Sequence, residues 1–296
     1  MRNALLKDLR PYPLAVSLDP RIPLPDGFHG IKVFVFDTSV APEDRLRQAF
    51  DWADGVWLVA PETGGILENL TRQVTASGKG SLGSTSEAIA LTADKYRTIR
   101  YLQSLSFECV PCWTLGEFEL QVPPPWVVKP LDGVGCEGTC VTSQLPVETE
   151  QNVIIQPFVE GESLSLSALF DSGKSVLLSV NRQIIERREG RFHLLGCQVN
   201  ALSDEDGRFQ RLCDRIAAAI PGLWGYAGVD LILHQDRALI LEINPRLTLS
   251  YTGLSRALGT SVAAMVIEIA KGERTMAEVA SWRRGLQGQS VWVTAQ

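Results

Sequence analysis

The chain has 296 residues, enough for one large domain or two to three small ones, and its hydrophobic fraction of 45% is ordinary for a globular core. A formal net charge of −6 argues against broad binding to nucleic acid or to anionic membranes. Apolar runs stay shorter than the roughly 18 residues of a membrane-spanning helix. We therefore expect neither a nucleic-acid partner nor a membrane partner.

The six cysteines are dispersed, and the first residues, M-R-N-A-L-L-K-D-L-R-P, lack the apolar core and cleavage site of a signal peptide. Reduced thiols in the cytoplasm are then the default. The segment Cys109-Val110-Pro111-Cys112 has the spacing of a redox or zinc motif. No second pair matches that spacing and no histidine sits at ligand spacing, so the sequence favours neither role.

Strand and helix patterns alternate over the first hundred residues. Short buried strands are expected at 14–18, 32–36 and 56–60, and helices at 43–52 and from Gly64 onward. This alternation is typical of a small parallel α/β layer. A further helix is expected over 92–105, with Thr92 as its N-cap.

Strands dominate after the break at Pro123-Pro124-Pro125. They are expected between residues 126 and 186, the last two as a pair joined near 171–174. Helices are expected over 204–220, 252–258 and 260–271. The tail from Gly272 is polar, with a strand-like S-V-W-V-T near its end.

Two alternating apolar runs between Gly228 and Arg246 flank the turn-like His234-Gln235-Asp236-Arg237, which is a hairpin signal. With a three-residue turn centred on Asp236, Asp230 lies directly opposite Glu242. Asn244 points the same way as Glu242, because side chains on a strand alternate faces. The opposite, apolar face is then formed by Leu231, Leu233, Leu239 and Leu241.

Two carboxylates opposite each other on one sheet repel. At ~4–5 Å and an effective dielectric constant near ~20 the repulsion is about 3–4 kcal/mol, so we expect a cation between them. Asp230, Glu242 and Asn244 carry hard oxygen ligands that suit Mg²⁺ shared with substrate phosphates. A surface hairpin with scattered polar residues is the alternative, which the apolar opposite face argues against.

A glycine-rich segment, Gly133-Val134-Gly135-Cys136-Glu137-Gly138, matches G-x-G-x-x-G, a weak signal by itself. A dinucleotide fold needs a helix directly after it, but the β-branched Thr139-Cys140-Val141-Thr142 favours strand, loop and strand. Gly133, Gly135 and Gly138 could then bend over phosphates and offer backbone N–H groups. Lys129, at the end of the entering strand, could reach the same phosphates. An ordinary flexible hairpin is the alternative.

Together these motifs resemble the ATP-grasp superfamily over roughly Leu82 to Gly259. Lys95, in L-T-A-D-K-Y, resembles the family's first phosphate lysine, and Lys129 with the glycine-rich segment resembles the second lysine and the phosphate loop. Residues 154–162, I-I-Q-P-F-V-E-G-E, resemble the segment along which adenine lies. The resemblance implies an α/β (α+β) ATP-grasp fold. Its expected parts are a small N-terminal α/β domain over 1–90, ATP-grasp subdomains over 91–160 and 161–275, and a tail over 276–296.

The resemblance also implies roles for single residues. Gln156 and the backbone of Pro157, Phe158 and Val159 would face the base, and Glu162 the ribose hydroxyls. Asp230, Glu242 and Asn244 match the metal ligands, Lys95 and Lys129 the phosphate-neutralising lysines, and Arg246 a basic residue near the transferred phosphate. Arg182, in S-V-N-R-Q, could hold phosphate or a substrate carboxylate, or could be a surface arginine. Glu62 could shape the substrate side, whereas Thr63 next to it could be a helix N-cap.

Three stretches resemble the tyramine–glutamate ligase family, which makes a γ-glutamyl amide in methanofuran-type cofactor synthesis. They are A-P-E-T-G-G-I-L-E-N-L-T (60–71), L-G-S-T-S-E-A-I (82–89) and N-P-R-L-T-L-S-Y-T-G-L (244–254). That family's first domain usually opens with a strand and a glycine-rich turn, whereas this chain opens on the helix-like Asn3–Leu9.

This resemblance implies an ATP-dependent carboxylate–amine ligase that forms an acyl phosphate and joins L-glutamate to tyramine or tyrosine. The implied cofactors are ATP and one or two Mg²⁺ ions, for which Mn²⁺ could substitute. The implied partners are a glutamate-like carboxylate and an aromatic amine, and a homodimer is compatible with them. The alternatives are a ligase for another acid and amine, such as an amino-acid or dipeptide ligase, and a non-catalytic nucleotide-binding subunit. The intact acids, both lysines and Arg246 argue against the last of these.

Overall fold

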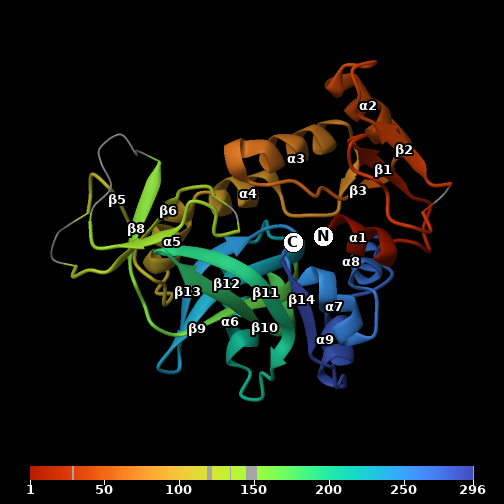
Figure 1. The fold of residues 1–296 in the computed structure, drawn as a ribbon. Helices are drawn as coiled ribbons and strands as arrows, with labels where there is room; N and C mark the ends of the chain where they lie inside the picture. Colours follow the sequence, from red (N-terminus) through yellow and green to blue (C-terminus); the bar gives the residue numbers. More distant parts are fainter. Residues whose placement is uncertain (29, 119–121, 134, 145–151, 296) are drawn as a thin grey trace.

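The computed structural model describes residues 1–296 apart from 29, 119–121, 134, 145–151 and 296. The described part contains two short parallel sheets and one ten-stranded sheet, with helices packed around them (Figure 1). The expected α/β (α+β) class is confirmed.

The first eighty residues form small parallel α/β units, as the alternating pattern predicts. Strand β1 (Ala15–Leu18) pairs with β2 (Lys32–Val35), and β3 (Gly55–Val56) pairs with β4 (Gly80–Ser81). The helical elements here are α1 (Arg2–Asp8), α2 (Pro42–Trp52), the 3₁₀ turn η1 (Thr63–Gly65) and α3 (Ile66–Ala76). The strand expected over 56–60 is much shorter, because the chain leaves the sheet after Val56.

The prediction of one helix over 92–105 is wrong at its N-terminal end. Helix α4 (Ser86–Ala93) ends first, and α5 (Lys95–Ser104) begins after a single residue. That residue, Asp94, is the N-cap, since its carboxylate accepts from the backbone N–H of Arg97 at 2.9 Å. Thr92 instead donates its hydroxyl to the Ala88 carbonyl within α4. The cap matters for the site because it makes Lys95 the first residue of α5.

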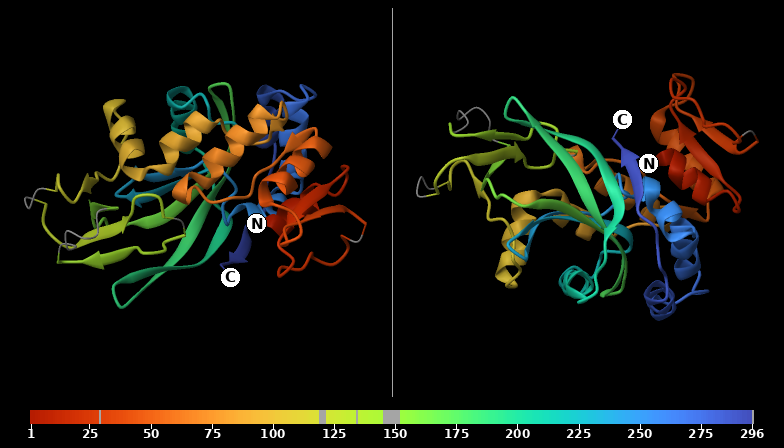
Figure 2. Two further views of the ribbon diagram at one scale, coloured as in Figure 1. Left: turned by 90° about the horizontal axis from the view of Figure 1, so that it is seen from above. Right: turned by 60° about the horizontal axis from the view of Figure 1, so that its bottom comes forward.

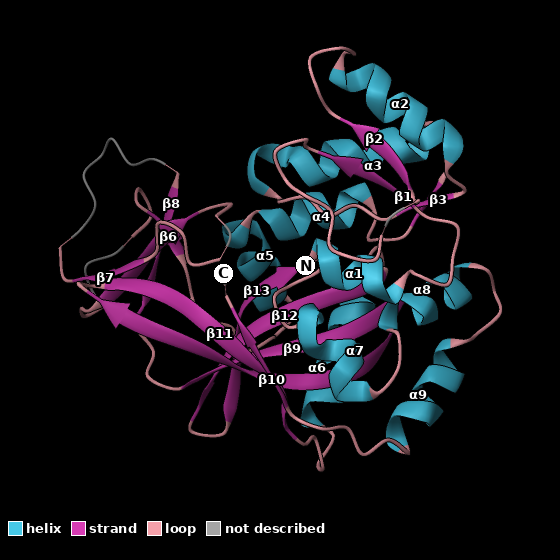
Figure 3. Cartoon of the chain, turned by 45° about the vertical axis from the view of Figure 1, so that its right-hand side comes forward, coloured by secondary structure: helices cyan, strands magenta, loops and turns pink. Residues whose placement is uncertain are grey.

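The large sheet is antiparallel, and its strand order is β13-β12-β9-β10-β11-β7-β6-β8-β5, with β14 also paired to β11. Figure 3 shows the long β10 and β11 running from the helices α7 and α9 towards β7. The strands are β5 (Trp113–Thr114), β6 (Trp126–Pro130), β7 (Cys140–Thr142), β8 (Val153–Pro157), β9 (Glu162–Asp171), β10 (Lys174–Arg188), β11 (Arg191–Leu202), β12 (Gly225–His234), β13 (Arg237–Asn244) and β14 (Val291–Thr294).

One face of the sheet is covered by α4, α5 and α6 (Arg208–Ala219), whose apolar side chains meet those of β9 and β12. The other face, towards the chain's end, packs on α1, α7 (Tyr251–Leu258), α8 (Val262–Ala270) and α9 (Met276–Arg284), which Figure 2 shows grouped at one side. Between these helices and the glycine-rich segment the second face stays open. The sheet therefore presents one part of its surface to a cleft.

The tail from Gly272, which the sequence predicts to be polar, contains a helix with a buried face. Helix α9 begins with a capping box at Thr275 and Glu278 and buries Met276 and Val279, and β14 forms at the expected S-V-W-V-T. Two buried apolar residues on a short helix are a weak signal in a charged sequence, so the amino-acid pattern alone predicts a polar tail.

No single helix in the described ranges is long and apolar enough to cross a membrane. Helices α7 and α8 reach that length only together, with a 92° bend between them.

Candidate active site

A cleft of about 1910 Å³ opens between the glycine-rich segment, the β12–β13 hairpin and the helices α1 and α7. Its walls come from stretches far apart in the chain. They include Lys95, Lys129, Gly133, Gly135, Gln156, Phe158, Val159, Asp230, Glu242, Asn244 and Arg246. Most of the residues expected to bind nucleotide or metal therefore line one cavity.

As expected, the hairpin places Asp230 opposite Glu242, and it also pairs Gly228 with Asn244. The route to this register differs from the expected three-residue turn. The turn has two residues, Gln235 and Asp236, both with positive φ (47° and 66°), which is the geometry of a type I′ hairpin turn. A bulge beyond Leu231 then shifts the pairing by one residue and restores the alignment of the two acids.

The two-residue turn and the bulge together change the expected apolar face. Leu231 is buried in the core cluster with Ile240 and Ile243 of β13, and the partly buried Ala238 packs against it. Leu239 is also buried, at 8% exposure, but does not belong to that cluster. Leu241 lines the cleft beside the acids. The extra residue in β13 makes two neighbouring side chains face the same way, so strict alternation fails there.

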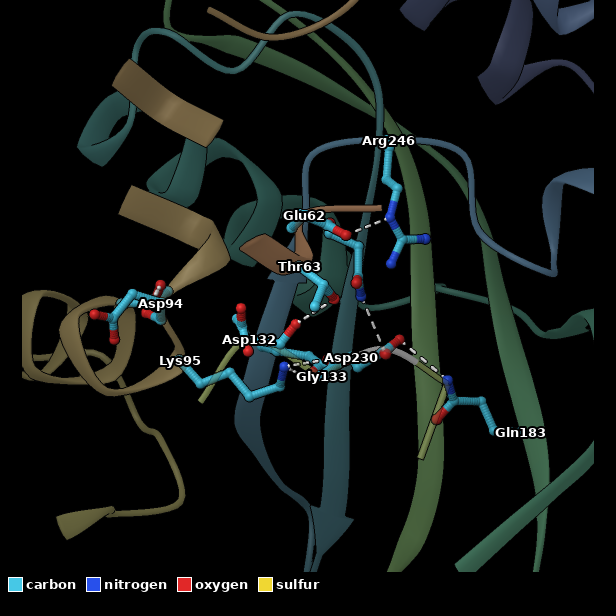
Figure 4. Close-up of polar contacts among 12 residues, drawn as sticks. Glu62, Thr63, Asp94, Lys95, Asp132, Gly133, Gln183, Asp230 and Arg246 are labelled. Atoms are coloured by element: carbon cyan, nitrogen blue, oxygen red, sulfur yellow. Dashed lines mark hydrogen bonds and ion pairs between the residues drawn. The ribbon is translucent and has the colours of Figure 1, made fainter. Parts of the chain in front are cut away.

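Asp230 has two amide partners. The side-chain nitrogen of Gln183 donates to one of its oxygens at 3.1 Å (Figure 4). The side-chain nitrogen of Asn244 donates to the other at 3.2 Å. Burial, and next the negative charge of Glu242, raise the pKa of Asp230 to about 8. Without a compensating cation, this pair of acids favours holding a proton.

Two lysines supply positive charge from the other wall. Lys95 reaches Glu242 at 3.4 Å and donates to the carbonyl of Gly133, while Lys129 lies on β6, only 8% exposed. Burial lowers the pKa of Lys129, and Glu242 partly opposes that shift. Burial would raise the pKa of Glu242, but the charges of Lys95 and Lys129 outweigh it and hold that pKa below its usual range. Glu242 is therefore the charged member of the acid pair.

The donor set fits a hard divalent cation. Among the described residues no three side chains of His, Cys, Asp or Glu gather at one point, so the candidate set remains two carboxylates and one amide. Carboxylate and amide oxygens are what Mg²⁺ takes when it keeps waters and substrate phosphates in its remaining positions. Burial, and next the charge of Glu242, raise the pKa of Asp230, and a divalent cation at this place would favour the charged form of both acids.

The glycine-rich segment joins two antiparallel strands, β6 and β7, as the strand-loop-strand interpretation predicts. Gly135 and Gly138 have φ of 64° and 68°, and a Cβ on Gly138 would lie 2.9 Å from the ring of Pro130. These positions require glycine for backbone reasons. Val134, in the middle of the motif, lies outside the described residues.

The adenine segment leads from β8 into the cleft wall. Phe158 and Val159 line the cavity, and the backbone N–H of Phe158 donates to Pro125. The amide of Gln156 is 1% exposed and donates to the Val110 carbonyl at 3.1 Å. Gln156 therefore ties this segment to the chain before β5.

Arg182 and Glu162 form an ion pair with each other, and Arg182 also donates to Gln198 at 3.1 Å. Among the described residues the cleft wall is formed by their neighbours Gln183 and Ser163, which point to the opposite face of the sheet. The geometry does not bring Arg182 or Glu162 to the phosphates or the ribose, so their expected roles stay predictions. Gln183, which sequence reasoning missed, contacts Asp230 instead.

Arg246 is held from two sides. Its Nε donates to Glu62 at 2.6 Å (Figure 4). Its Nη1 donates to the Leu247 carbonyl at 3.0 Å. Glu62 comes from the N-terminal part and is 5% exposed. The N-cap role expected for Thr63 is wrong, since its hydroxyl donates to the Asp132 carbonyl at 2.8 Å. The sequence predicts that Glu62 lies near the substrate, but it does not predict that Glu62 pairs with Arg246.

Comparison with known proteins agrees with this geometry. A family model described as "ATP-grasp domain" matches residues 92–250, and one described as "pre ATP-grasp 3 domain" matches residues 12–89. A tyramine–L-glutamate ligase of Methanocaldococcus fervens is 34% identical over 83% of this chain and 77% of its own length. A probable alpha-L-glutamate ligase of Xylella fastidiosa is 29% identical over 72% of this chain and 76% of its own length.

Among solved structures, an Archaeoglobus fulgidus protein described as belonging to the ATP-grasp superfamily superposes with a TM-score of 0.68 at 25% identity. The match covers 90% of this chain and 79% of that one. The geometry of the cleft, with its two lysines and its pair of acids, thus agrees with the family models. The chain belongs to the ATP-grasp family, with a particular resemblance to tyramine–L-glutamate ligase.

Proposed function

We propose that this ATP-grasp ligase joins a carboxyl group of L-glutamate to the amine of tyramine or tyrosine, with release of ADP and phosphate. One observation carries the reaction type: Lys95, Lys129, the Asp230–Glu242 pair and Arg246 converge on one cleft. The similarity to a tyramine–L-glutamate ligase supports the substrates. Glutamate also occurs in the name of the Xylella relative, so the acid has more support than the amine.

ATP-grasp enzymes use ATP and a divalent metal ion. We place Mg²⁺, one ion or two, at Asp230, Glu242 and Asn244, with Mn²⁺ as a substitute. The bound metal would supply charge neutralisation for the phosphates during their transfer. Asp230 and Glu242 bring two oxygens to the same side of one hairpin, and Gln183 and Asn244 orient Asp230 by hydrogen bonds.

The phosphates of ATP would lie between the two lysines and the glycine-rich segment. Lys95 and Lys129 supply point charges, and Gly133, Gly135 and Gly138 leave the backbone N–H groups free of side-chain obstruction. The base would lie along Gln156 to Val159, which lead into the cavity. Burial lowers the pKa of Lys129, and a nearby phosphate would favour its charged form.

Two displacements complete the proposed reaction. A carboxylate oxygen of glutamate attacks the γ-phosphorus of ATP and ADP leaves, which gives an acyl phosphate. The unprotonated amine then attacks the acyl carbon, phosphate leaves, and the nitrogen loses one proton. The chain's contribution to both steps is positioning and charge stabilisation, and Arg246 is placed to stabilise the transferred phosphoryl group.

An assay with purified enzyme, ATP, Mg²⁺, L-glutamate and either tyramine or tyrosine tests the proposal. We expect ADP release together with a γ-glutamyl amide of one of the two amines, identified by mass spectrometry. ADP release with glutamate but no product from either amine would refute the proposed acceptor. Substituting amino acids or dipeptides for the amine then tests the amino-acid or dipeptide ligase alternative.

We place the enzyme in the cytoplasm, which the six free cysteines support, four of them buried. Homodimer formation stays a prediction, and light scattering on the purified protein checks it. A role in methanofuran-type cofactor synthesis also stays a prediction, because it depends on the identity of the amine.

A further inference from the structure

The segment Glu62-Thr63-Gly64, here called the 62–64 turn, contacts both walls of the phosphate site. It belongs to the N-terminal part of the chain, whereas both of its contacts lie in the ATP-grasp part. Figure 4 shows Glu62 beside Arg246 and Thr63 beside Asp132. A turn in this place could transmit the position of one part to the other.

The first contact fixes Arg246. Its side chain is 12% exposed and that of Glu62 6%, so the two charges neutralise each other away from water. Nε and Nη1 are engaged, by Glu62 and by the Leu247 carbonyl, and Nη2 has no hydrogen-bond partner within the described part of the chain. Because Arg246 lines the cleft, this arrangement leaves the N–H groups of Nη2 for a ligand anion.

The second contact fixes the start of the glycine-rich segment. The hydroxyl of Thr63 donates to the backbone carbonyl of Asp132 at 2.8 Å, and the backbone N–H of Gly64 donates to its carboxylate at 3.0 Å. From the opposite side, the backbone N–H of Lys95 donates to Leu131 and its ammonium to Gly133. Residues 131–133 are thereby held between the 62–64 turn and the lysine that we place on the phosphates.

We propose that the 62–64 turn positions the phosphoryl-transfer groups: Glu62 aims Arg246, and Thr63 with Gly64 sets the glycine-rich segment through Asp132. Glu62 is a positioning residue, because it acts through Arg246. The N-terminal part then takes a direct part in the ATP chemistry. This inference rests on the proposed function for its kinetic test, and its binding test stands without that function.

The kinetic test uses Glu62→Gln, which keeps the shape but removes the charge. We expect kcat for ADP release to fall about 10- to 100-fold, since small misplacements of a transition-state group cost that much, while KM for ATP stays within about threefold. If Glu62 acts through Arg246, adding Glu62→Gln to Arg246→Gln lowers the rate no further. The matched control is Glu68→Gln on α3, an acid in the same part of the chain that pairs with Arg72 and should leave kcat unchanged.

The binding test uses Thr63→Val, which removes the bond to Asp132 and keeps the volume. We expect Kd for ATP to rise about fivefold and deuterium uptake of residues 131–133 to increase, because these residues lose one of their anchors. Thr75→Val is the control, since the Thr75 hydroxyl donates to the Thr71 carbonyl within α3 and its loss should change neither quantity.

Three results would overturn the inference. Glu62→Gln could retain kcat within twofold, its effect could add fully to that of Arg246→Gln, or Thr63→Val could leave Kd for ATP and deuterium uptake as in the wild type. If the wild type binds ATP but forms no amide with any amine, the proposed substrates fail while the binding test still decides on the turn. A Glu62→Gln protein that does not fold leaves the decision to Thr63→Val.

Discussion

The two acids of the hairpin differ in charge although they lie opposite each other. Glu242 faces Lys95 and Lys129, which hold its pKa below its usual range against the effect of burial. Asp230 accepts hydrogen bonds from the amides of Gln183 and Asn244, but burial, and next the charge of Glu242, outweigh them and raise its pKa. Glu242 is thus the charged acid of the pair, and we expect its replacement to weaken the metal site most.

We therefore predict that Glu242→Gln lowers kcat for ADP release by about 10²–10⁴-fold, the equivalent of several kcal/mol of charge stabilisation supplied with the metal. The coupled ADP assay at saturating Mg²⁺ measures this. Glu108→Gln is the control, because Glu108 forms an exposed pair with Arg237 at the other end of β13 and should leave the rate unchanged. Activity of Glu242→Gln equal to wild type would contradict the metal site.

At this scale, spacing along the chain decides what a sequence can predict. Asp230, Glu242 and Asn244 are close in sequence, and a hairpin pattern alone brings them together. Gln183 reaches Asp230 across 47 positions and Glu62 reaches Arg246 across 184, so no local periodicity signals either contact. The contact of Gln183 with Asp230 depends on the order of strands in the sheet, and the arginine partner of Glu62 depends on how the N-terminal part packs against the rest.

At the scale of elements, the hairpin achieves its register by two compensating irregularities. The two-residue turn and the bulge in β13 together give the alignment that a three-residue turn would give alone. The acid pairing was therefore predictable from the sequence, but the side-chain direction of Leu239 and Leu241 was not. Period-two alternation contains no information about a bulge.

We predict that Gln235→Asn with Asp236→Gly stabilises the protein by about 1 kcal/mol without loss of activity. Both residues have positive φ, which asparagine and glycine tolerate better, and the type I′ turn would keep its length. Urea denaturation measures the gain. Equal or lower stability of the double variant would contradict the assigned turn geometry.

Helix α1 is joined to α7 by one carboxylate. The hydroxyls of Tyr251 and Ser255 both donate to the same oxygen of Asp8, at 2.7 and 2.5 Å. Burial raises the pKa of Asp8 above its usual 3.8, although both hydroxyls oppose the shift. The folded state then binds this proton more tightly than the unfolded state, so the contribution of Asp8 to stability is greatest at low pH and is lost as pH rises through the raised pKa.

We predict that the stability of Asp8→Asn relative to wild type increases as the pH rises from 4 to 7. Asparagine accepts the same hydrogen bonds but does not titrate, so only the wild type loses stability over this range. Chemical denaturation at the two pH values measures the difference. Asp8→Ala should instead cost about 1.5–3 kcal/mol at neutral pH, since it leaves the buried hydroxyl of Tyr251 without an acceptor. A pH-independent difference between Asp8→Asn and wild type would contradict the assigned shift.

On the scale of the whole molecule, the cleft exists because separate parts of the chain meet. Lys95 begins α5, Lys129 lies near the end of β6, the acids lie on the β12–β13 hairpin, and Glu62 comes from the N-terminal part. Motif order predicted the family and the fold, which are both confirmed. The meeting of α1 with α7 was not predicted, since neither helix carries a motif that names its partner.

A cleft assembled from so many segments should gain stability when ATP and Mg²⁺ fill it together. Ligand that binds only the folded state at about 100 times its Kd adds about 2.7 kcal/mol, which should raise the thermal midpoint of a chain this size by several degrees. We expect ATP with EDTA to give a smaller rise than ATP with Mg²⁺, and Glu242→Gln to lose that metal-dependent part. Differential scanning fluorimetry measures each condition. Equal shifts for Glu242→Gln and wild type with ATP and Mg²⁺ would place the metal away from Glu242, and the lysines alone would then account for nucleotide binding.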